Sequence, residues 1–248
     1  MIVLFGCLIV SMIPSLLIYF WFAHMYKGDT EHTKTCRKLF WKGVLCVLGI
    51  FALDLVLSLL WSMTGLSGKS ELIDVLFKCF ILNAFVEELV KLMNARSVIR
   101  KKSGAVSWLS MIMYTTIVAI GFALAEDVVY AFTTSPGQIL VRGVTAGHAV
   151  YGLISGYFIG KAYKYGEKKY SFIGTFVPWL LHGMYNFGLD STKAGLGEDL
   201  STAFGMISVT IAAAGVVYII VMLLKIRKYR EDPVYTEPLM LHSGSNKD

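Results

Sequence analysis

Two adjacent glutamates, Glu87 and Glu88, stand in the otherwise apolar stretch NAFVEELVKLMNAR, and Lys91 follows them on the same segment. An ionised side chain at the centre of a bilayer costs at least about 2.5–3.5 kcal/mol, so charged groups in apolar segments are candidates for function. A carboxylate held there can act as a general base on a water molecule. A structural alternative stays open, because Glu87 and Lys91 are four residues apart and could form a simple helix ion pair.

Three further segments place polar side chains in apolar surroundings. Glu126 and Asp127 lie in GFALAEDVVYAF, His148 lies in GHAVYG, and LLHGMYNF contains His182 and Asn186. Peptide hydrolysis needs an activated water molecule, a proton donor for the leaving amine and stabilisation of the oxyanion. Glutamates and histidines suit the first two tasks. His182 and Asn186 are one helical turn apart and could both face the oxyanion.

The same residue types also suit a metal ion. Glu126, His148 and His182 could bind zinc, because histidine and carboxylate ligands with an open coordination position make a catalytic zinc site. The chain contains no HExxH motif, which is the specific signature of a zinc-dependent protease helix. The sequence therefore leaves the cofactor open between none and zinc. We favour the metal-free reaction at this point, because the acids outnumber the histidines.

The elements that must carry these residues are membrane-spanning helices. The chain has 248 residues, of which 56% are hydrophobic and only 16% are charged, against about 25% charged residues in soluble domains. About 20 apolar residues cross a bilayer as a helix. The sequence offers such segments at Ile2–Phe22, Phe40–Met63, about Val75–Val98, Ser107–Phe132, Ile139–Tyr163, Tyr170–Leu189 and Thr202–Leu224. We predict an all-α polytopic membrane protein of about seven transmembrane helices, with one transmembrane domain over residues 1–230 and a disordered cytoplasmic tail over 231–248.

Lysines and arginines gather in every second predicted loop, namely after the first, third and fifth spans and at the start of the tail. Because such residues mark the cytoplasmic side, the N-terminus is expected outside and the C-terminus in the cytoplasm. The net charge of +6 is then explained by topology, and nucleic acid is not needed as a partner. In this arrangement Glu126, His148 and His182 fall in the outer half of the bilayer, and Glu88 matches their depth if the third span starts near Cys79. The polar groups can then converge on one cavity open to the outside.

Four motifs occur in order on successive predicted helices. FVEELVK contains EExxK, GFALAEDVVYAF resembles an FxxxE segment, GHAVYG is HxxxG, and HGMYN is HxxxN. Over residues 12–190 or so, the chain resembles the PrsW family of intramembrane proteases, which is related to the CAAX prenyl endopeptidases. By motif, the resemblance implies site residues at Glu87, Glu88, Glu126, His148 and His182. One departure is Asp127, which stands where the family pattern suggests Asn.

The resemblance implies proteolysis of a membrane-anchored protein in the bacterial cytoplasmic membrane. The expected substrate is an anti-sigma factor, cut first on its extracytoplasmic side. In relatives of the CAAX type an oxyanion-binding Asn stands at the position of Gly152, so Asn186 is expected to take that task here, while Lys91 keeps one glutamate of the pair ionised.

Two other classes of protein remain as alternatives. A proton- or ion-coupled transporter also places Glu, Lys and His along a path through the membrane. The odd number of spans and the lack of an evident repeat argue against it, since transporters often contain duplicated halves. A non-catalytic scaffold subunit of a protease is the other alternative. The complete set of acids and histidines argues against a scaffold subunit that has lost catalytic activity.

Overall fold

The computed structural model describes residues 2–26, 28–102 and 106–239, and the elements of this part of the chain are helical. In chain order they are α1 (Ile2–His24), α2 (Thr30–Met63), α3 (Glu71–Leu76), η1 (Phe77–Val86), α4 (Glu87–Ile99), η2 (Arg100–Lys102), α5 (Trp108–Tyr130), α6 (Pro136–Thr145), α7 (Gly147–Tyr165), α8 (Lys168–Asp190), η3 (Ser191–Lys193), α9 (Glu198–Tyr229) and α10 (Pro233–Thr236). The predicted all-α class is confirmed.

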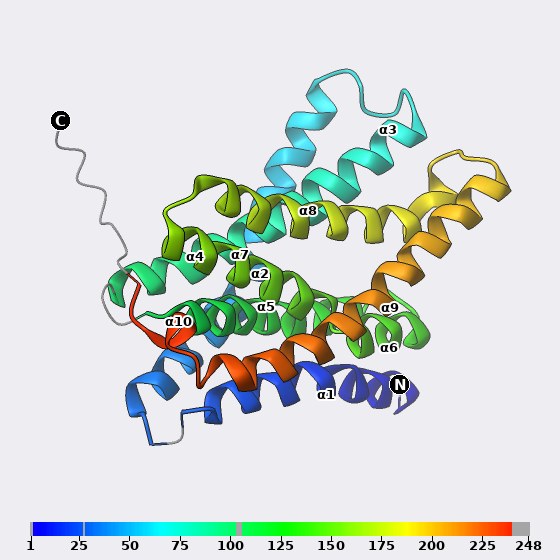
Figure 1. The fold of residues 1–248 in the computed structure, drawn as a ribbon. Helices are drawn as coiled ribbons and strands as arrows, with labels where there is room; N and C mark the ends of the chain where they lie inside the picture. The colour runs from blue at the N-terminus through cyan, green and yellow to red at the C-terminus, as the bar shows by residue number, and fades with distance from the viewer. Residues whose placement is uncertain (1, 27, 103–105, 240–248) are drawn as a thin grey trace, which may run out of the picture.

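Helix α5 forms the centre of the bundle. Every residue from Trp108 to Phe122 is buried, and α5 packs mainly against α7 and α2 (Figure 1). The contact with α7 is close because α7 has glycines where it crosses α5. A Cβ atom on Gly152 would stand 2.7 Å from the Cα of Thr116, and one on Gly156 would stand 2.5 Å from the Cα of Ile112. These glycines therefore let two helix backbones approach, as small residues do in membrane bundles.

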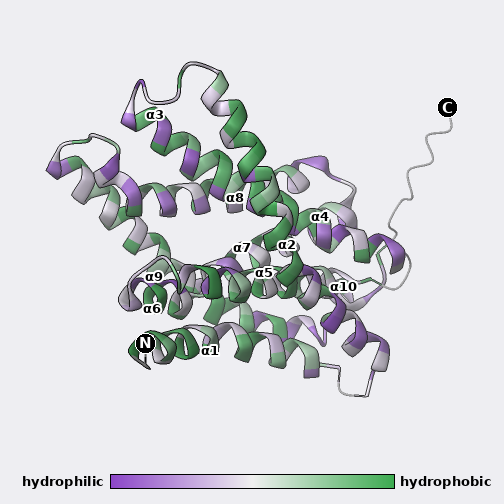
Figure 2. Ribbon diagram, turned by 180° about the vertical axis from the view of Figure 1, so that it is seen from behind, coloured by the Kyte–Doolittle hydropathy of each residue, from purple (hydrophilic) through white to green (hydrophobic). Residues whose placement is uncertain are grey.

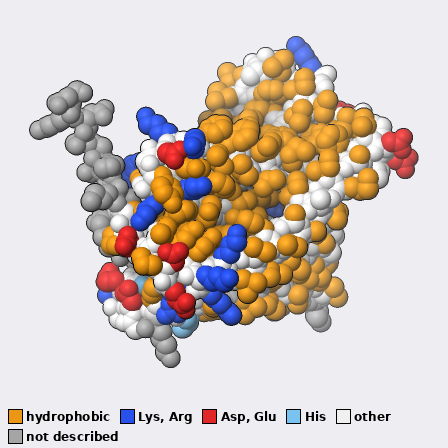
Figure 3. Space-filling view, viewed as in Figure 1, with side chains coloured by type: hydrophobic (Ala, Val, Ile, Leu, Met, Phe, Trp, Pro, Cys, Tyr) orange, Lys and Arg blue, Asp and Glu red, His pale blue; other side chains and the backbone are white. Residues whose placement is uncertain are grey.

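The outer surface of the bundle is apolar, as expected for a multi-pass membrane protein. Four helices are long and apolar enough to cross a membrane, at Val3–His24, Thr30–Met63, Trp108–Tyr130 and Glu198–Tyr229. The hydropathy colouring shows hydrophobic residues along the outer helices, with hydrophilic residues gathered mostly towards their ends (Figure 2). On the face drawn in Figure 3, lysine and arginine side chains collect at the end of the molecule near α10.

The third predicted span, from about Val75 to Val98, is built from three successive helical pieces, α3, η1 and α4. The middle piece, η1, is a π-helix of 10 residues. A π-helix makes a wider turn than an α-helix and is often found at functional sites. Here it ends directly before Glu87 and so sets the direction in which the two glutamates leave the helix.

The prediction of one continuous helix over Ile139–Tyr163 is wrong. Helix α6 ends at Thr145 and α7 begins at Gly147. Between them, Ala146 adopts a left-handed backbone conformation with φ 46° and ψ 41°. His148 is consequently the second residue of α7 and does not lie in the middle of a long helix, as the predicted boundaries required.

The structure also differs at the start of the predicted disordered tail. Residues Pro233–Thr236 form α10, and the ring of Tyr235 stacks on that of Tyr229 with centroids 3.7 Å apart. The backbone N–H of Leu239 donates to the carbonyl of Val106 at 2.8 Å. Aromatic stacking and this backbone bond attach the chain after α9 to the start of α5. Residues 240–248 lie outside the described residues.

Candidate active site

The two glutamates open helix α4 and have different surroundings. The Nζ atom of Lys91 lies 2.6 Å from Oε1 of Glu88 but 4.0 Å from Oε2 of Glu87, and all three side chains are buried. The near partner of Lys91 is therefore Glu88, three residues away, and the simple ion pair with Glu87 is at most a weak contact. The Oε2 atom of Glu87 is buried and has no hydrogen-bond partner among the described residues.

His182 comes from α8 and is 3% exposed. Its Nδ1 atom lies 2.9 Å from Oε1 of Glu88, and its Nε2 atom faces Oε2 of Glu87 at 3.9 Å. An ionised Glu88 only accepts hydrogen bonds, so the network assigns the ring proton to Nδ1. The lone pair of Nε2 is then directed to the side of Glu87.

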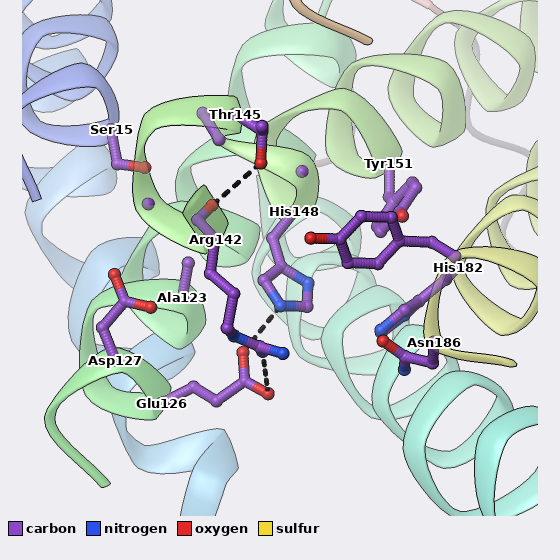
Figure 4. A pocket seen from close by; sticks show the side chains of 14 residues that line it. Ser15, Ala123, Glu126, Asp127, Arg142, Thr145, His148, Tyr151, His182 and Asn186 are labelled. Carbon is purple, nitrogen blue, oxygen red and sulfur yellow. Dashed lines mark hydrogen bonds and ion pairs between the residues drawn. The ribbon is translucent and has the colours of Figure 1, made fainter. Parts of the chain in front are cut away.

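His148 comes from the start of α7 and joins two charged groups. Its Nε2 atom lies 2.7 Å from Oε2 of Glu126 on α5, and its Nδ1 atom lies 2.9 Å from Nζ of Lys91. Glu126 is held from its other side by Arg142 of α6, whose Nη2 atom is 2.9 Å from Oε1 (Figure 4). The four residues form one chain of contacts in the order Lys91, His148, Glu126 and Arg142, of which the first three are buried and Arg142 is partly buried.

The structure brings most of the predicted site residues to one cavity. Glu126, His148, His182 and Asn186 all line a small cavity of about 30 Å³ (Figure 4). Asp127 lines it from the side of α1, where Ser11 Oγ donates to Asp127 Oδ2 at 3.4 Å. Glu88 and Lys91 do not line this cavity. They contact the two histidines that do: Glu88 contacts His182, and Lys91 contacts His148.

The group that could hold a metal ion differs from the predicted one. Ligand atoms of Glu87, His148 and His182 lie within 4.8 Å of one another, and the three residues are buried. The prediction had Glu126 in the place of Glu87. In the structure, Glu126 is engaged by His148 and Arg142. The Oε2 atom of Glu87 has no hydrogen-bond partner in the described part of the chain and only the longer contacts with Lys91 and His182. Glu87 is therefore the carboxylate that is free to bind an ion.

Two larger cavities adjoin this centre. One, of about 240 Å³, lies between α2, η1 and α5 and is lined by Glu87 and Glu126 together with Asp54 and Asn83. The other, of about 330 Å³, is apolar, lies between α7, α8 and α9, and shares Tyr185 with the small cavity. The centre thus has a polar space on one side and an apolar space on the other.

The sequence patterns did not single out three residues of this region. Arg142 was treated only as a loop charge, although its position six residues before His148 could have connected it with that histidine. Asp54 is a lone carboxylate in a predicted span and was a detectable signal, because intramembrane charges are rare. Tyr185 carried no signal, since a tyrosine in an apolar helix is ordinary.

Comparison with known proteins agrees with the geometry. Residues 31–224 match the family described as PrsW family intramembrane metalloprotease. Protease PrsW of Clostridioides difficile (strain 630) is 30% identical over 190 residues, which cover 72% of this chain and 77% of that protein. Protease PrsW of Bacillus subtilis (strain 168) is 28% identical over 178 residues, which cover 70% of this chain and 77% of that protein. No solved structure matches the chain significantly.

The matched region contains all of η1, α4, α5, α6, α7 and α8. These are the elements that supply the buried glutamates, the histidines and the cavity that they line. The family match therefore covers the site as well as the surrounding helices, and the chain belongs to the PrsW family of intramembrane proteases, as a membrane peptidase.

Proposed function

We propose that this chain is a zinc-dependent endopeptidase that hydrolyses a peptide bond of a membrane-anchored protein at a centre made of Glu87, His148 and His182. One observation carries the proposal. The buried Oε2 atom of Glu87 has no partner among the described residues and faces Nε2 of His182 at 3.9 Å. The metalloprotease description of the family supports this choice over the metal-free reaction that the sequence alone favoured.

The residues present fit a zinc ion. Zinc lies about 2.0–2.2 Å from carboxylate and imidazole ligands, so two ligands of one ion can be up to roughly 4 Å apart. The ligand atoms of Glu87, His148 and His182 lie within 4.8 Å of one another, so they would move slightly inwards around an ion. One nitrogen of His148 would then exchange its present contact with Lys91 or Glu126 for the ion. One carboxylate and two imidazoles, with a further position open, are a known ligand set of catalytic zinc. Glu88, which contacts Nδ1 of His182 at 2.9 Å, has the place of the carboxylate that orients a zinc-binding histidine. A bound zinc ion would supply Lewis-acid chemistry at the water molecule and at the scissile carbonyl.

The residues around the ion site have separate tasks in this proposal. Glu88 holds the ring of His182, and Lys91 compensates the charge of Glu88. Glu126 takes the proton that the attacking water releases and passes it to the leaving amine, as a general base and then a general acid. Arg142 fixes the carboxylate of Glu126 during both steps through its contact of 2.9 Å.

Topology and substrate belong to the same proposal. We assign seven membrane crossings over residues 1–230, with the N-terminus outside, and a cytoplasmic tail over 231–248. Besides the four apolar spans, the crossings are α3–η1–α4, α7 and α8. Helix α7 has 19 residues, which is about 28 Å at 1.5 Å per residue and close to the thickness of the bilayer core. The substrate we propose is a single-span protein such as an anti-sigma factor, cut on the extracytoplasmic side.

Purified protein in detergent, incubated with candidate single-span substrates, tests the reaction. We expect cleavage that stops with a chelator and returns with zinc, and about one zinc ion per chain. Glu87→Gln should abolish cleavage and lower zinc content. Glu71→Gln, on the short helix α3, is the matched control and should change neither.

Other results would contradict the proposal in distinct ways. Cleavage that survives chelation in zinc-free protein would return the assignment to a glutamate-driven reaction. If no substrate is cut while protons or ions cross liposomes containing the protein, the transporter alternative holds. Full activity of both Glu87→Gln and Glu88→Gln would show that neither Glu87 nor Glu88 takes part in catalysis.

A further inference from the structure

Two buried hydrogen-bond donors of the small cavity have no partner among the residues that the structure describes. They are the hydroxyl of Tyr185 and the Nε atom of Arg142. Buried polar groups are nearly always paired, so each such atom calls for a ligand. The Nε–H of arginine can only donate, and the phenol of tyrosine donates readily. The cavity that contains His148 and His182 therefore presents two donors that no acceptor of the described residues satisfies.

Contacts fix the side chain of Arg142 and the stretch of helix backbone that carries Tyr185. The carbonyl of Tyr185 accepts a hydrogen bond of 2.7 Å from Ser208 Oγ on α9. The guanidinium of Arg142 lies 4.0 Å from the centroid of the Tyr130 ring, while its Nη2 atom contacts Glu126. Donors that are fixed before the substrate arrives stabilise a developing charge without reorganisation.

The position of Tyr185 connects the donors with the substrate. It follows His182 by three residues on α8, so the two side chains leave the same face of the helix. It also lines the apolar cavity between α7, α8 and α9. Tyr185 is thus one of the residues at which the two cavities meet, with Thr145, Gly147 and Tyr151. A substrate segment that lies in the apolar cavity and presents a peptide bond to the histidines comes close to Tyr185.

We infer that Tyr185 and Arg142 form the oxyanion site of the enzyme, a role that the sequence had led us to expect of His182 and Asn186. This inference rests on the proposed hydrolysis. The water oxygen bonds to the carbonyl carbon, the π electrons of the carbonyl move to its oxygen, and Tyr185 Oη and Arg142 Nε donate to that oxygen. The C–N bond then breaks, and the amine leaves with the proton that the water released. Both nitrogen atoms of His182 are directed to Glu88 and Glu87, so its ring is engaged in the glutamate cluster.

Tyr185→Phe removes the hydroxyl and Arg142→Lys removes the Nε–H while retaining a cation for Glu126. We expect each to lower kcat by about 10²–10³, the usual loss for one oxyanion donor, with KM changed less than threefold. Affinity for a phosphinic peptide, whose charged oxygen imitates the oxyanion, should fall by a similar factor, and affinity for an uncleavable substrate peptide should not. Tyr157→Phe, on α7 beside Trp108, is the control and should behave as the wild type.

Wild-type kcat in Tyr185→Phe, or a loss confined to KM, would overturn the inference. Because the wild-type protein is assayed in parallel, this result leaves the proposed function intact, whereas a wild type that cuts nothing contradicts the proposed function itself. If Tyr185→Phe does not fold, difluorotyrosine at position 185 keeps the shape and the donor but makes the phenol more acidic. The pH profile of kcat should then shift to lower pH on its alkaline side, and an unchanged profile would overturn the inference.

Discussion

Lys91 and Glu88 form an ion pair of 2.6 Å in which the lysine side chain is 4% exposed and the glutamate side chain 8% exposed. The pair lies inside the bundle, and each partner contacts a histidine: Glu88 lies 2.9 Å from Nδ1 of His182, and Lys91 lies 2.9 Å from Nδ1 of His148. Breaking a buried pair leaves the remaining charge uncompensated, which is far more costly than the loss of an exposed pair.

Replacement of the lysine should therefore affect stability more than chemistry. We expect Lys91→Met to destabilise the protein by about 3–5 kcal/mol, with a partial loss of turnover. The double variant Lys91→Met/Glu88→Gln should be more stable than Lys91→Met, since the stranded charge is gone. Thermal unfolding in detergent measures both effects. Lys78→Met, which breaks the half-exposed pair with Asp190, is the control and should cost at most about 1 kcal/mol. Equal stability of Lys78→Met and Lys91→Met would show that the buried pair is unimportant.

The break between α6 and α7 gives a second prediction. A left-handed conformation costs an L-residue about 1–2 kcal/mol, and glycine avoids this cost. Ala146→Gly should keep turnover and leave the midpoint of thermal unfolding equal or slightly higher. Ala146→Val should lower both, because a β-branched residue is especially unfavourable with positive φ and His148 stands only two residues away. A valine variant with wild-type turnover and midpoint would contradict the strain at this position.

The close contact between α5 and α7 gives a third prediction. Gly156→Ala places a methyl group against the backbone at Ile112, and overpacking of this kind costs about 1–3 kcal/mol or more. Gly205→Ala, on α9, meets open space and should be neutral or stabilising, because alanine favours helix formation. The difference between the two unfolding midpoints measures the cost of separating α5 from α7. Similar midpoints would mean that the helices separate easily.

The proposed topology gives a fourth prediction. Reporter fusions at residues 35, 102, 166 and the C-terminus should report the cytoplasm, and fusions at residues 67, 136 and 195 should report the outside. The alternating basic loops supply the reason. A C-terminus found outside would contradict the seven-span topology and, with it, the extracytoplasmic position of the cut.

The sequence predicted the helices better than it predicted their interruptions. Long apolar runs locate α1 and α5 within about two residues at each end, because hydropathy over a whole span is a strong signal. The same signal misses the polar first turns of α2, which begins at Thr30 and not at Phe40, and the ends of α9 (Glu198–Tyr229). The break at Ala146 has no such signal, since alanine rarely adopts positive φ. The chain turns there because α6 packs mainly against α1, whereas α7 packs mainly against α5. The π-helix η1 likewise depends on its contacts with α8, not on the residues Phe77–Val86 alone.

The same distinction applies to the candidate site. The intramembrane acids and histidines were detectable individually, because apolar surroundings make them conspicuous. Their pairing was not, since residue spacing fixes which side chains share a helix face but not how each helix is rotated against its neighbours. Thus Glu126 was expected to share an ion with the histidines, whereas the structure directs it to Arg142 and leaves Oε2 of Glu87 without a hydrogen-bond partner among the described residues.

The joining of α4, α5, α7 and α8 by buried charges has a consequence for how the protein is made. The segment with Glu87, Glu88 and Lys91 leaves the ribosome before Glu126, His148 and His182 exist. Lys91 can neutralise Glu88 at once within the same helix. Glu87 meets His148 and His182 only after α7 and α8 have been synthesised. Neither the segment from α3 to α4 nor α7 or α8 is among the helices apolar enough to cross a membrane by length and composition. We therefore expect these helices to remain beside the translocon and to enter the lipid together, as a group assembled during synthesis rather than as independent spans.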